Sequence, residues 1–440
     1  MFRAVARIFR TPDLRRKIAF TIGIVALFRL GSFIPTPFVD FENVQLCLDS
    51  NAGPSGLYDL VNLFSGGALL KLSVFALGIM PYITASIITQ LLRVVIPHFD
   101  TLHKEGQSGQ AKLTQYTRYM TIALGILQST TLITVARSGA LFGGTGVAEC
   151  SQLITDTSWY AILLMVITMT AGTGLIMWMG ELITERGIGN GMSLLIFISI
   201  AATFPQALWA IQTENGFEIF LIVLALGLAI TGFVVFVEQS QRRIPVQYAK
   251  RMVGRRTYGG NNTYIPIKVN MAGVIPVIFA SSLLYLPALI AQFNSPTQGE
   301  EMAPWVVWIQ NNLTSGDNPL YMAIYFFLII GFTYFYVAIT FNPEEVADNM
   351  KKYGGFIPGI RAGRPTAEYL DYVLTRVTLP GSIYLGLVAL IPLVALATVG
   401  ANQNFPFGGA SILIIVGVGL ETVKQIDSQL QQRHYEGLLR

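Results

Sequence analysis

The side chains most often used in catalysis are few in this chain and lie far apart. The three histidines, His98, His103 and His434, fall in polar segments between apolar ones. None of them belongs to an HExxH zinc motif, and the sequence has neither a GxSxG nucleophile turn nor a GxxxxGK[ST] phosphate loop. The string ERGIGNGMS at 185–193 opens an apolar segment instead of following a strand, so it is a weak nucleotide signal. The sequence therefore predicts no enzyme, no metal site and no cofactor.

The elements that would position any functional group are membrane spans. Of the 440 residues, 52% are hydrophobic and only 12% are charged, and the mean hydropathy is +0.55, as expected for a chain that lies largely in lipid. A bilayer core of about 30 Å requires roughly twenty apolar residues per helical span. Ten such stretches are present, at 18–34, 72–92, 120–135, 159–179, 188–204, 217–237, 271–291, 320–340, 377–398 and 407–420. The sequence predicts an all-α polytopic membrane protein.

The orientation follows from the basic residues, because Lys and Arg are retained on the cytoplasmic side. All but three of the 29 lie in the termini or in alternate loops, which places these segments and both chain ends in the cytoplasm. The exceptions are Arg29 inside the first span, Lys71 beside the second and Arg137 at the end of the third. The opposite loops contain few Lys and Arg residues and are predicted to lie outside the cell.

The only two cysteines, Cys47 and Cys150, fall in the two longest outer loops of the N-terminal half. An oxidising compartment would allow them to pair. A Cys47 to Cys150 disulfide and two unrelated thiols both remain open, since the sequence gives no geometry. A mass shift on alkylation without reductant would reject the bond.

Two kinds of membrane transport fit the spans poorly. Ion-coupled carriers usually place Asp, Glu or His within the membrane, whereas Glu181, Glu218, Glu238 and Glu421 lie at or beyond span ends. Carbonyls of broken helices can bind ions without carboxylates, so a carrier remains an alternative. An ion channel is disfavoured because nothing resembles a carbonyl filter or a repeated ring of charge.

The stretch LYDLVNLF at 57–64 is too short to cross a membrane and carries Asp59 and Asn62. It precedes Ser65, Gly66 and Gly67, where we expect non-helical backbone. Such backbone is tolerated at membrane depth only inside protein or beside an aqueous cavity. The pattern favours a short helix on a glycine hinge that acts as a movable stopper, and a surface re-entrant loop without a gating role is the alternative.

Apolar residues at helical spacing recur in three spans. Ile79 and Ile83 share a face around Pro81, where we expect a kink. Met192 and Ile196 repeat that spacing, and Ile278 follows Pro276. Periodicity alone does not distinguish such residues from ordinary lipid or helix contacts.

Several strings, taken in order, resemble signature segments of the SecY family of protein translocation channels along essentially the whole chain. They are FRLGSFIPTP, NLFSGGALLKLSVFALGIMPYITASIITQLL, KEGQSGQAKLTQYTRY, MWMGELITERGIGNGMSLLIF, VEQSQRRIPVQYAKR, KVNMAGVIPVIFASS and FNPEEVADNMKKYGGFIPGIRAGRPT.

The resemblance implies ten helices in two inverted five-helix halves, 1–204 and 217–440, joined by an external hinge at 205–216. The second half would carry cytoplasmic loops at 238–270 and 341–376 and a cytoplasmic tail at 421–440. The halves would enclose a central pore that also opens sideways into lipid.

The resemblance also implies a ring of apolar side chains at the pore waist, which closes to a dewetted constriction. Carried over by motif, the ring is Ile79, Ile83, Met192, Ile196, Ile278 and Ile414. Methionine in place of a sixth isoleucine keeps the volume and adds flexibility. The plug beneath the ring would be Leu57, Tyr58, Asp59, Leu60, Val61, Asn62, Leu63, Phe64, Ser65, Gly66 and Gly67.

A lateral gate is implied between the second and third spans on one side and the seventh and eighth on the other. Its polar cluster would be Thr84, Gln128 and Asn270. Interhelical hydrogen bonds in lipid contribute about 0.6 to 2 kcal/mol each, so an entering signal helix can replace them. An ordinary structural hydrogen bond is the alternative for each.

The basic cytoplasmic loops resemble the docking loops of the family. They are expected to dock the ATPase SecA and, through RNA phosphates, the ribosome, and the expected contact residues are Arg255, Arg256, Arg361 and Arg364. Arg361 is the first choice for SecA, and Arg255 and Arg256 are the first choices for the ribosome. Positive-inside topology by itself accounts for much of this charge.

The resemblance further implies SecE, SecG, a YidC-type insertase and signal-bearing preproteins as partners. It implies the bacterial cytoplasmic membrane as the location. A protein-conducting channel thus stands ahead of an ion-coupled carrier and a scaffold without transport.

Overall fold

The computed structural model describes residues 11–49, 62, 65–137, 153–156, 158–248, 251–253, 256–258, 263–293, 303–314, 318–399 and 409–436. Helices dominate these ranges. Their bounds are α2 Pro12–Gly31, α3 Phe41–Asp49, α5 Met80–Val95, α6 Pro97–Lys104, α7 Gln107–Arg137, α8 Trp159–Arg186, α9 Gly191–Gln239, α10 Ile275–Phe293, α11 Pro304–Ile309, η3 Gln310–Thr314, α12 Pro319–Thr340, α13 Pro343–Lys352, α14 Arg364–Val399 and α15 Gly409–Glu436.

Each of the ten predicted apolar stretches overlaps one of these helices, with the fifth and sixth stretches both in α9. By length and composition, five helical stretches of the described chain are suited to cross a membrane, and a sixth if α5 and α6, bent by 101°, form one span. Shorter apolar helices cover 191–205 and 275–284. The prediction of an all-α polytopic membrane protein is confirmed.

The second span differs from its expected form. Its helix α5 begins at Met80, whereas an apolar helix from residue 72 was expected. The backbone before it makes turns, with positive φ at Gly78 (56°) and at Leu72 (45°), conformations that stop a right-handed helix. Pro81 consequently lies in the first turn, where its missing N–H costs nothing, so the expected kink at this residue is wrong.

Helix α9 joins the fifth and sixth spans. It continues through Pro205 and bends at Gly216, where φ is 83° and ψ is 170°. Only glycine adopts this combination readily, since a Cβ would clash there. The segment 205–216, expected to be a hinge, is therefore helical up to its last residue.

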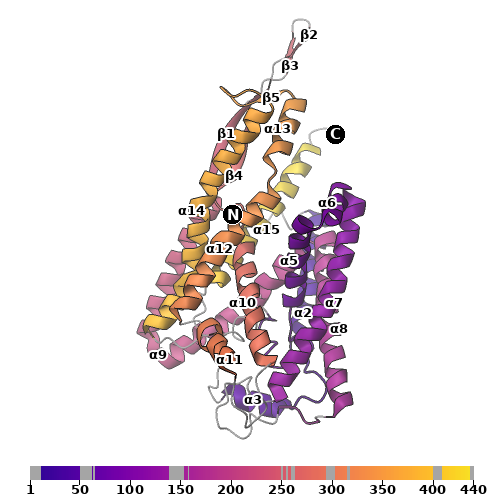
Figure 1. Ribbon diagram of the computed structural model, residues 1–440, viewed down its shortest axis with the longest axis vertical. Coiled ribbons are helices and arrows are strands. Elements are labelled where there is room, and N and C mark those ends of the chain that lie inside the picture. Colours follow the sequence, from indigo (N-terminus) through magenta and orange to yellow (C-terminus); the bar gives the residue numbers. More distant parts are fainter. Residues whose placement is uncertain are drawn as a thin grey trace.

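The chain places the connections that are rich in Lys and Arg and those that are poor in them at opposite ends. In Figure 1, α6, α13 and the strands lie at one end, and α3 and α11 lie at the other. The first end holds the basic loops that the sequence assigns to the cytoplasm. The partition of basic residues along the sequence thus corresponds to a partition in space.

A small sheet, which the sequence analysis did not predict, joins the two large basic loops. Strand β1 Gln241–Tyr248 pairs antiparallel with β4 Thr263–Lys268 and, through its last two residues, with β5 Gly355–Phe356. Beyond it, β2 Arg251–Val253 pairs with β3 Arg256–Tyr258. The loop after the sixth span is thus an extended hairpin.

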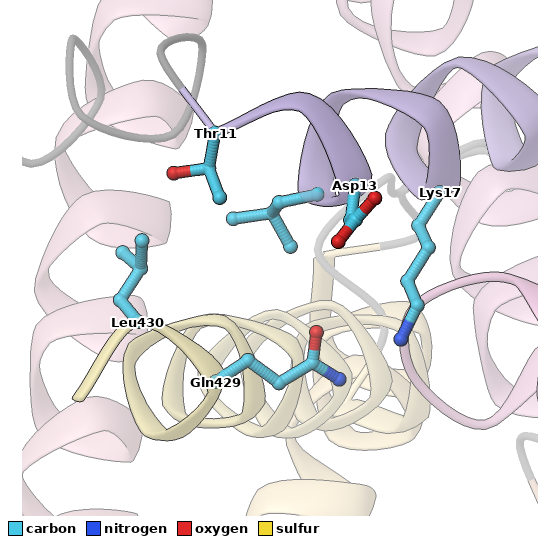
Figure 2. Close-up of a pocket in the computed structure, with 6 residues that line it drawn as sticks. Thr11, Asp13, Lys17, Gln429 and Leu430 are labelled. Carbon is cyan, nitrogen blue, oxygen red and sulfur yellow. The ribbon is translucent and has the colours of Figure 1, made fainter. Parts of the chain in front are cut away.

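The first and last described helices meet at the same end of the molecule. A cavity of about 20 Å³ separates Thr11, Asp13, Leu14 and Lys17 from Gln429 and Leu430 of α15 (Figure 2). This space holds roughly one water molecule, so it is a packing gap and not a binding site. Residues 11–17 near the start of the chain and 429–430 near its end therefore lie close together.

The membrane helices pack around two apolar cores. The first is formed mainly by α2, α5, α7, α8 and the first part of α9, and the second by the rest of α9 with α10, α12, α14 and α15. Ile278, Ile414 and Val418 are exceptions, because they come from the second half but pack in the first core. The two halves therefore meet where these residues lie.

Candidate functional site

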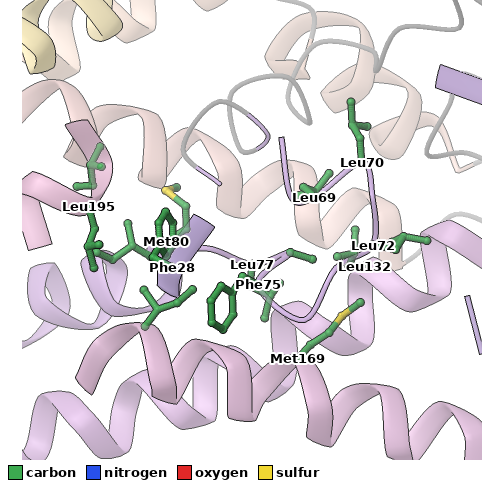
Figure 3. Packing of buried hydrophobic residues seen from close by; sticks show 14 of the residues in the cluster. Phe28, Leu69, Leu70, Leu72, Phe75, Leu77, Met80, Leu132, Met169 and Leu195 are labelled. Atoms are coloured by element: carbon green, nitrogen blue, oxygen red, sulfur yellow. The ribbon is translucent and has the colours of Figure 1, made fainter. Parts of the chain in front are cut away.

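A non-helical segment at 66–79 connects the predicted plug to α5 and is buried in protein. Leu69, Leu72 and Phe75 are 2%, 0% and 5% exposed. Figure 3 shows the apolar side chains of this segment among residues of four helices, Phe28, Leu132, Met169 and Leu195. Irregular backbone at membrane depth is thus enclosed by protein, as the physics of lipid requires.

The backbone of this segment finds partners in the residues that follow α2. The carbonyl of Leu72 accepts hydrogen bonds from the Thr36 hydroxyl at 2.7 Å and from the Thr36 N–H at 3.1 Å. The N–H of Val74 donates to the carbonyl of Ile34 at 2.9 Å. Buried backbone groups without partners are costly, so these bonds explain how the segment stays non-helical.

The described part of the plug is Asn62, Ser65, Gly66 and Gly67. The Ser65 hydroxyl donates to the Asn62 carbonyl at 3.0 Å and accepts from the Leu69 N–H at 3.1 Å. Gly67 N–H also donates to the Asn62 carbonyl, at 3.0 Å. These bonds form a compact turn. The remaining plug residues, Leu57, Tyr58, Asp59, Leu60, Val61, Leu63 and Phe64, lie outside the described residues.

Arg29, the charge within the first span, contacts this turn. Its Nη1 donates to the Gly66 carbonyl at 3.1 Å. Gly66 has φ of 67°, and a Cβ there would meet Arg29 Nη1 at 2.9 Å and Ser199 Cα at 3.2 Å. No role was predicted for this arginine from the sequence. An isolated charge in a span is by itself a functional signal.

The predicted ring residues come from four helical elements and lie in one apolar cluster. Ile79, Ile196, Ile278 and Ile414 are 3%, 5%, 7% and 1% exposed and belong to the first apolar core, and Ile83 and Met192 are partly buried and pack against that core. Ile79 precedes α5 and accepts the Ile83 N–H at 3.1 Å, so the two lie one turn apart. The structure thus brings together side chains that are 335 residues apart at the extremes.

Met192 is positioned by the start of α9. The Asn190 side chain caps this helix by accepting from the N–H of Met192 at 3.1 Å and of Ser193 at 3.5 Å. A Cβ on Gly180 of α8 would lie 2.4 Å from the Met192 sulfur. The Met192 thioether therefore packs directly against the Gly180 backbone, and a side chain at this position of α8 would require the flexible thioether to move.

The three predicted gate residues are buried, at 8% exposure for Thr84 and Gln128 and 3% for Asn270. Helix α10 packs against both α5 and α7, which brings the two sides of the predicted seam together. Thr84 Oγ1 donates to its own helix, at the Met80 carbonyl (3.0 Å). Within the described chain, no hydrogen bond joins any two of the three side chains.

Asn270 instead bonds to a residue that the sequence analysis placed at a span end. Its Nδ2 donates to Glu238 Oε1 at 2.6 Å and to the Gly273 carbonyl at 3.1 Å. No spacing in the sequence indicates this pair, because a whole hairpin separates the two residues.

Three of the four predicted docking arginines, Arg256, Arg361 and Arg364, are among the described residues. Arg361 is exposed, in a loop held by a 2.8 Å hydrogen bond from the Thr366 hydroxyl to the Arg361 carbonyl. Arg364 forms a 3.1 Å ion pair with Glu368 in the first turn of α14. Arg256 is the first residue of β3, and Arg255 lies outside the described residues.

Cys47 of α3 is fully buried and disulfide-bonded. Cys150 lies outside the described residues, so its pairing with Cys47 stays a prediction. The neighbouring segments do approach one another, since the Asp40 N–H donates to the Leu153 carbonyl at 3.0 Å and the Thr155 N–H to the Phe38 carbonyl at 2.9 Å.

Comparison with known sequences gives consistent matches. The profile of the SecY family matches residues 73–423. The chain is 66% identical to the protein translocase subunit SecY of Streptomyces scabiei and 60% identical to that of Micrococcus luteus, in each case over all of both chains. It is 59% identical to that of Mycobacterium bovis, again over all of both chains.

Solved structures share the fold. A protein-conducting channel matches with a TM-score of 0.62 and 18% identity, covering 93% of this chain and 91% of the other. Sec61 in the canine ribosome-channel complex from the endoplasmic reticulum matches with a TM-score of 0.59 and the same identity and coverage.

Proposed function

Because the chain belongs to the SecY family and is therefore a translocation channel subunit and not an enzyme, we propose that six residues of its first apolar core form the waist of a passive pore for unfolded polypeptides. The six are Ile79, Ile83, Met192, Ile196, Ile278 and Ile414. The pore also releases membrane segments sideways into lipid.

The observation that supports this proposal is that these six residues, which come from both halves of the chain, belong to one apolar cluster together with many residues of the first half. Branched aliphatic side chains in contact exclude water, so the site resists ions when no client is present. The same side chains make no directional bonds with one another, so a polypeptide of any sequence can push them apart. A passive seal of this kind suits varied clients.

The plug and the lateral gate open and close the pore. The turn at 65–67, tied to Arg29 and close to Ser199, is the hinge on which the plug leaves the pore. The seam between α10 and the pair α5 and α7 is the lateral gate, with Thr84, Gln128 and Asn270 as its polar residues.

The energy comes from partners. SecA with ATP and the ribosome drive clients through the pore, and the exposed loops at the basic end receive them, with Arg361 as the main SecA contact and Arg255 and Arg256 on the ribosome side. Support for the ribosome comes from the similar channel that is described within a ribosome complex. SecE, SecG and a YidC-type insertase complete the assembly in the bacterial cytoplasmic membrane, with both termini in the cytoplasm.

The test is transport by reconstituted vesicles. The protein, with SecE and SecG, is placed in liposomes together with SecA, ATP and a signal-bearing precursor. We expect the precursor to become protected from external protease, and omission of ATP is the control. Accumulation of a small solute without protein protection would favour the ion-coupled carrier and contradict the proposal.

A further inference from the structure

The side-chain hydrogen bond between Glu238 and Asn270 closes the base of the basic hairpin. The last residue pair of the β1–β4 ladder on the membrane side is Gln241 and Lys268. Just beyond this pair, the Val269 N–H donates a hydrogen bond to the Ser240 carbonyl at 3.0 Å. The 2.6 Å bond from Asn270 Nδ2 to Glu238 Oε1 follows as the next contact, where the hairpin meets the membrane spans.

This bond fixes the orientation of the Asn270 amide. Its Nδ2 donates to two acceptors, the Glu238 carboxylate and the Gly273 carbonyl at 3.1 Å. A flipped amide would place Oδ1 against two oxygens that cannot donate, so only one orientation is favourable. The opposite atom, Oδ1, is buried and has no hydrogen-bond partner among the described residues.

A buried acceptor without a partner is costly, and in native proteins such an atom usually has a use. Asn270 lies five residues before Ile275, the first residue of α10, and this helix packs against α5 and α7. These two helices carry the donors of the predicted gate, the Thr84 hydroxyl and the Gln128 amide. The Thr84 hydroxyl currently donates to the Met80 carbonyl, a local bond that it can exchange.

We propose that Glu238 is a positioning residue of the lateral gate, which holds the Asn270 amide so that Oδ1 accepts a hydrogen bond from the opposite side of the closed gate. This inference rests on the proposed function of the gate. Because Glu238 and Asn270 flank the hairpin 241–268, a partner that moves the hairpin also moves the amide. The bond therefore links the docking surface to the gate.

The test compares export of two precursors in vesicles that contain the full complex, one with an intact signal and one with a defective signal. Loss of the bond in Glu238→Ala weakens the closed gate. We expect about a tenfold rise in the export of the defective precursor relative to the intact one, the size of effect typical of a lost hydrogen bond to a charged group. Glu238→Gln keeps an acceptor and should restore most of the selectivity.

Two controls make the result specific. Glu218→Ala removes an exposed carboxylate from the same helix and should leave the ratio unchanged. Asn270→Ala should raise the ratio as much as Glu238→Ala does, and the double variant should add nothing, since both changes remove one interaction. Where Glu238→Ala does not accumulate, Glu238→Asp carries the same prediction.

An unchanged ratio in Glu238→Ala, or additive effects in the double variant, would overturn the role of Glu238 while transport of the intact precursor continues. Failure of the unmodified protein to transport the intact precursor would instead overturn the proposed function, and this inference with it. Hydrogen exchange on the purified full chain gives an independent measurement. Faster exchange at 269–273 in Glu238→Ala supports the positioning role, and unchanged exchange contradicts it.

Discussion

Arg29 Nη1 donates a hydrogen bond to the carbonyl of Gly66 across 3.1 Å, which ties the first span to the turn at the end of the predicted plug. The guanidinium also lies over the Phe33 ring at 5.5 Å, and the Lys71 ammonium lies 4.1 Å from the centre of the same ring. Cations over an aromatic face are attracted to it. These contacts fix the one arginine within a span at a position where it can hold the plug hinge.

Replacement of Arg29 should let more ions through the resting pore. Arg29→Met keeps a long side chain but removes every donor, and a hydrogen bond from a charged group is worth about 1.5 to 3 kcal/mol. We expect resting ion conductance in planar bilayers to rise about tenfold or more. Arg137→Met, which changes an exposed arginine at the end of α7, is the matched control. Equal conductance of the Arg29 variant and the unmodified channel would refute the role of this contact.

Alanine substitutions at the two hinge glycines, Gly66 and Gly67, should affect the resting conductance differently, although both glycines have positive φ. A Cβ on Gly66 would meet Arg29 and the backbone of Ser199, whereas one on Gly67 would meet nothing within 4 Å. A left-handed conformation costs a non-glycine residue about 1 to 2 kcal/mol in both cases. Gly66→Ala should therefore raise resting conductance clearly more than Gly67→Ala. Indistinguishable currents would mean that close packing at Gly66 plays no part in the seal.

The non-helical segment should be sensitive to a single methyl group on α8. A Cβ on Gly172 would lie 2.1 Å from the Val74 carbonyl oxygen, whereas one on Gly174 would meet nothing within 4 Å. We expect Gly172→Ala to lower the thermal unfolding midpoint of the purified protein by several degrees, for a cost of about 1 to 3 kcal/mol. Gly174→Ala should leave the midpoint equal or slightly higher, because alanine favours helix. A midpoint unaffected by Gly172→Ala would argue against the close packing of segment 66–79 on α8.

Arg361 should matter for SecA-driven transport and not for stability. Its side chain is exposed, and the loop is held through its carbonyl, which Arg361→Ala retains. We expect precursor protection with SecA and ATP to fall about tenfold, as for a central interface arginine. Lys104→Ala, which removes an exposed cation from α6, is the control. Full transport by the Arg361 variant would remove this residue from the docking surface.

The sequence predicted the helical part of the fold well, because apolar stretches of span length have few alternatives in lipid. It failed where the reason lies in tertiary contacts. The start of α5 depends on bonds between Leu72 and Thr36 that are far apart in sequence. The polar extensions of α7 and α14 carry no apolar signal, and the small sheet depends on pairing between two distant loops.

The candidate site was likewise predicted only in part from the sequence. Motif resemblance identified six residues that the structure brings into one cluster. The residue that bonds to Asn270, Glu238, was not expected, because a carboxylate at a span end is ordinarily solvated. Its pairing arises only when β1 and β4 bring the two chain segments together.

The most direct test of the central claim is a crosslink from the apolar cluster to a client caught in transit. Cysteines are introduced one at a time at Ile79, Ile278 and, as a control, at Val388, which is equally buried but lies in the second core. A precursor with a single cysteine is stalled halfway across the membrane by a folded domain at its end. We predict crosslinks at Ile79 and Ile278 and none at Val388. A crosslink at Val388 with none at the two isoleucines would show that the client takes another path, and would contradict the account.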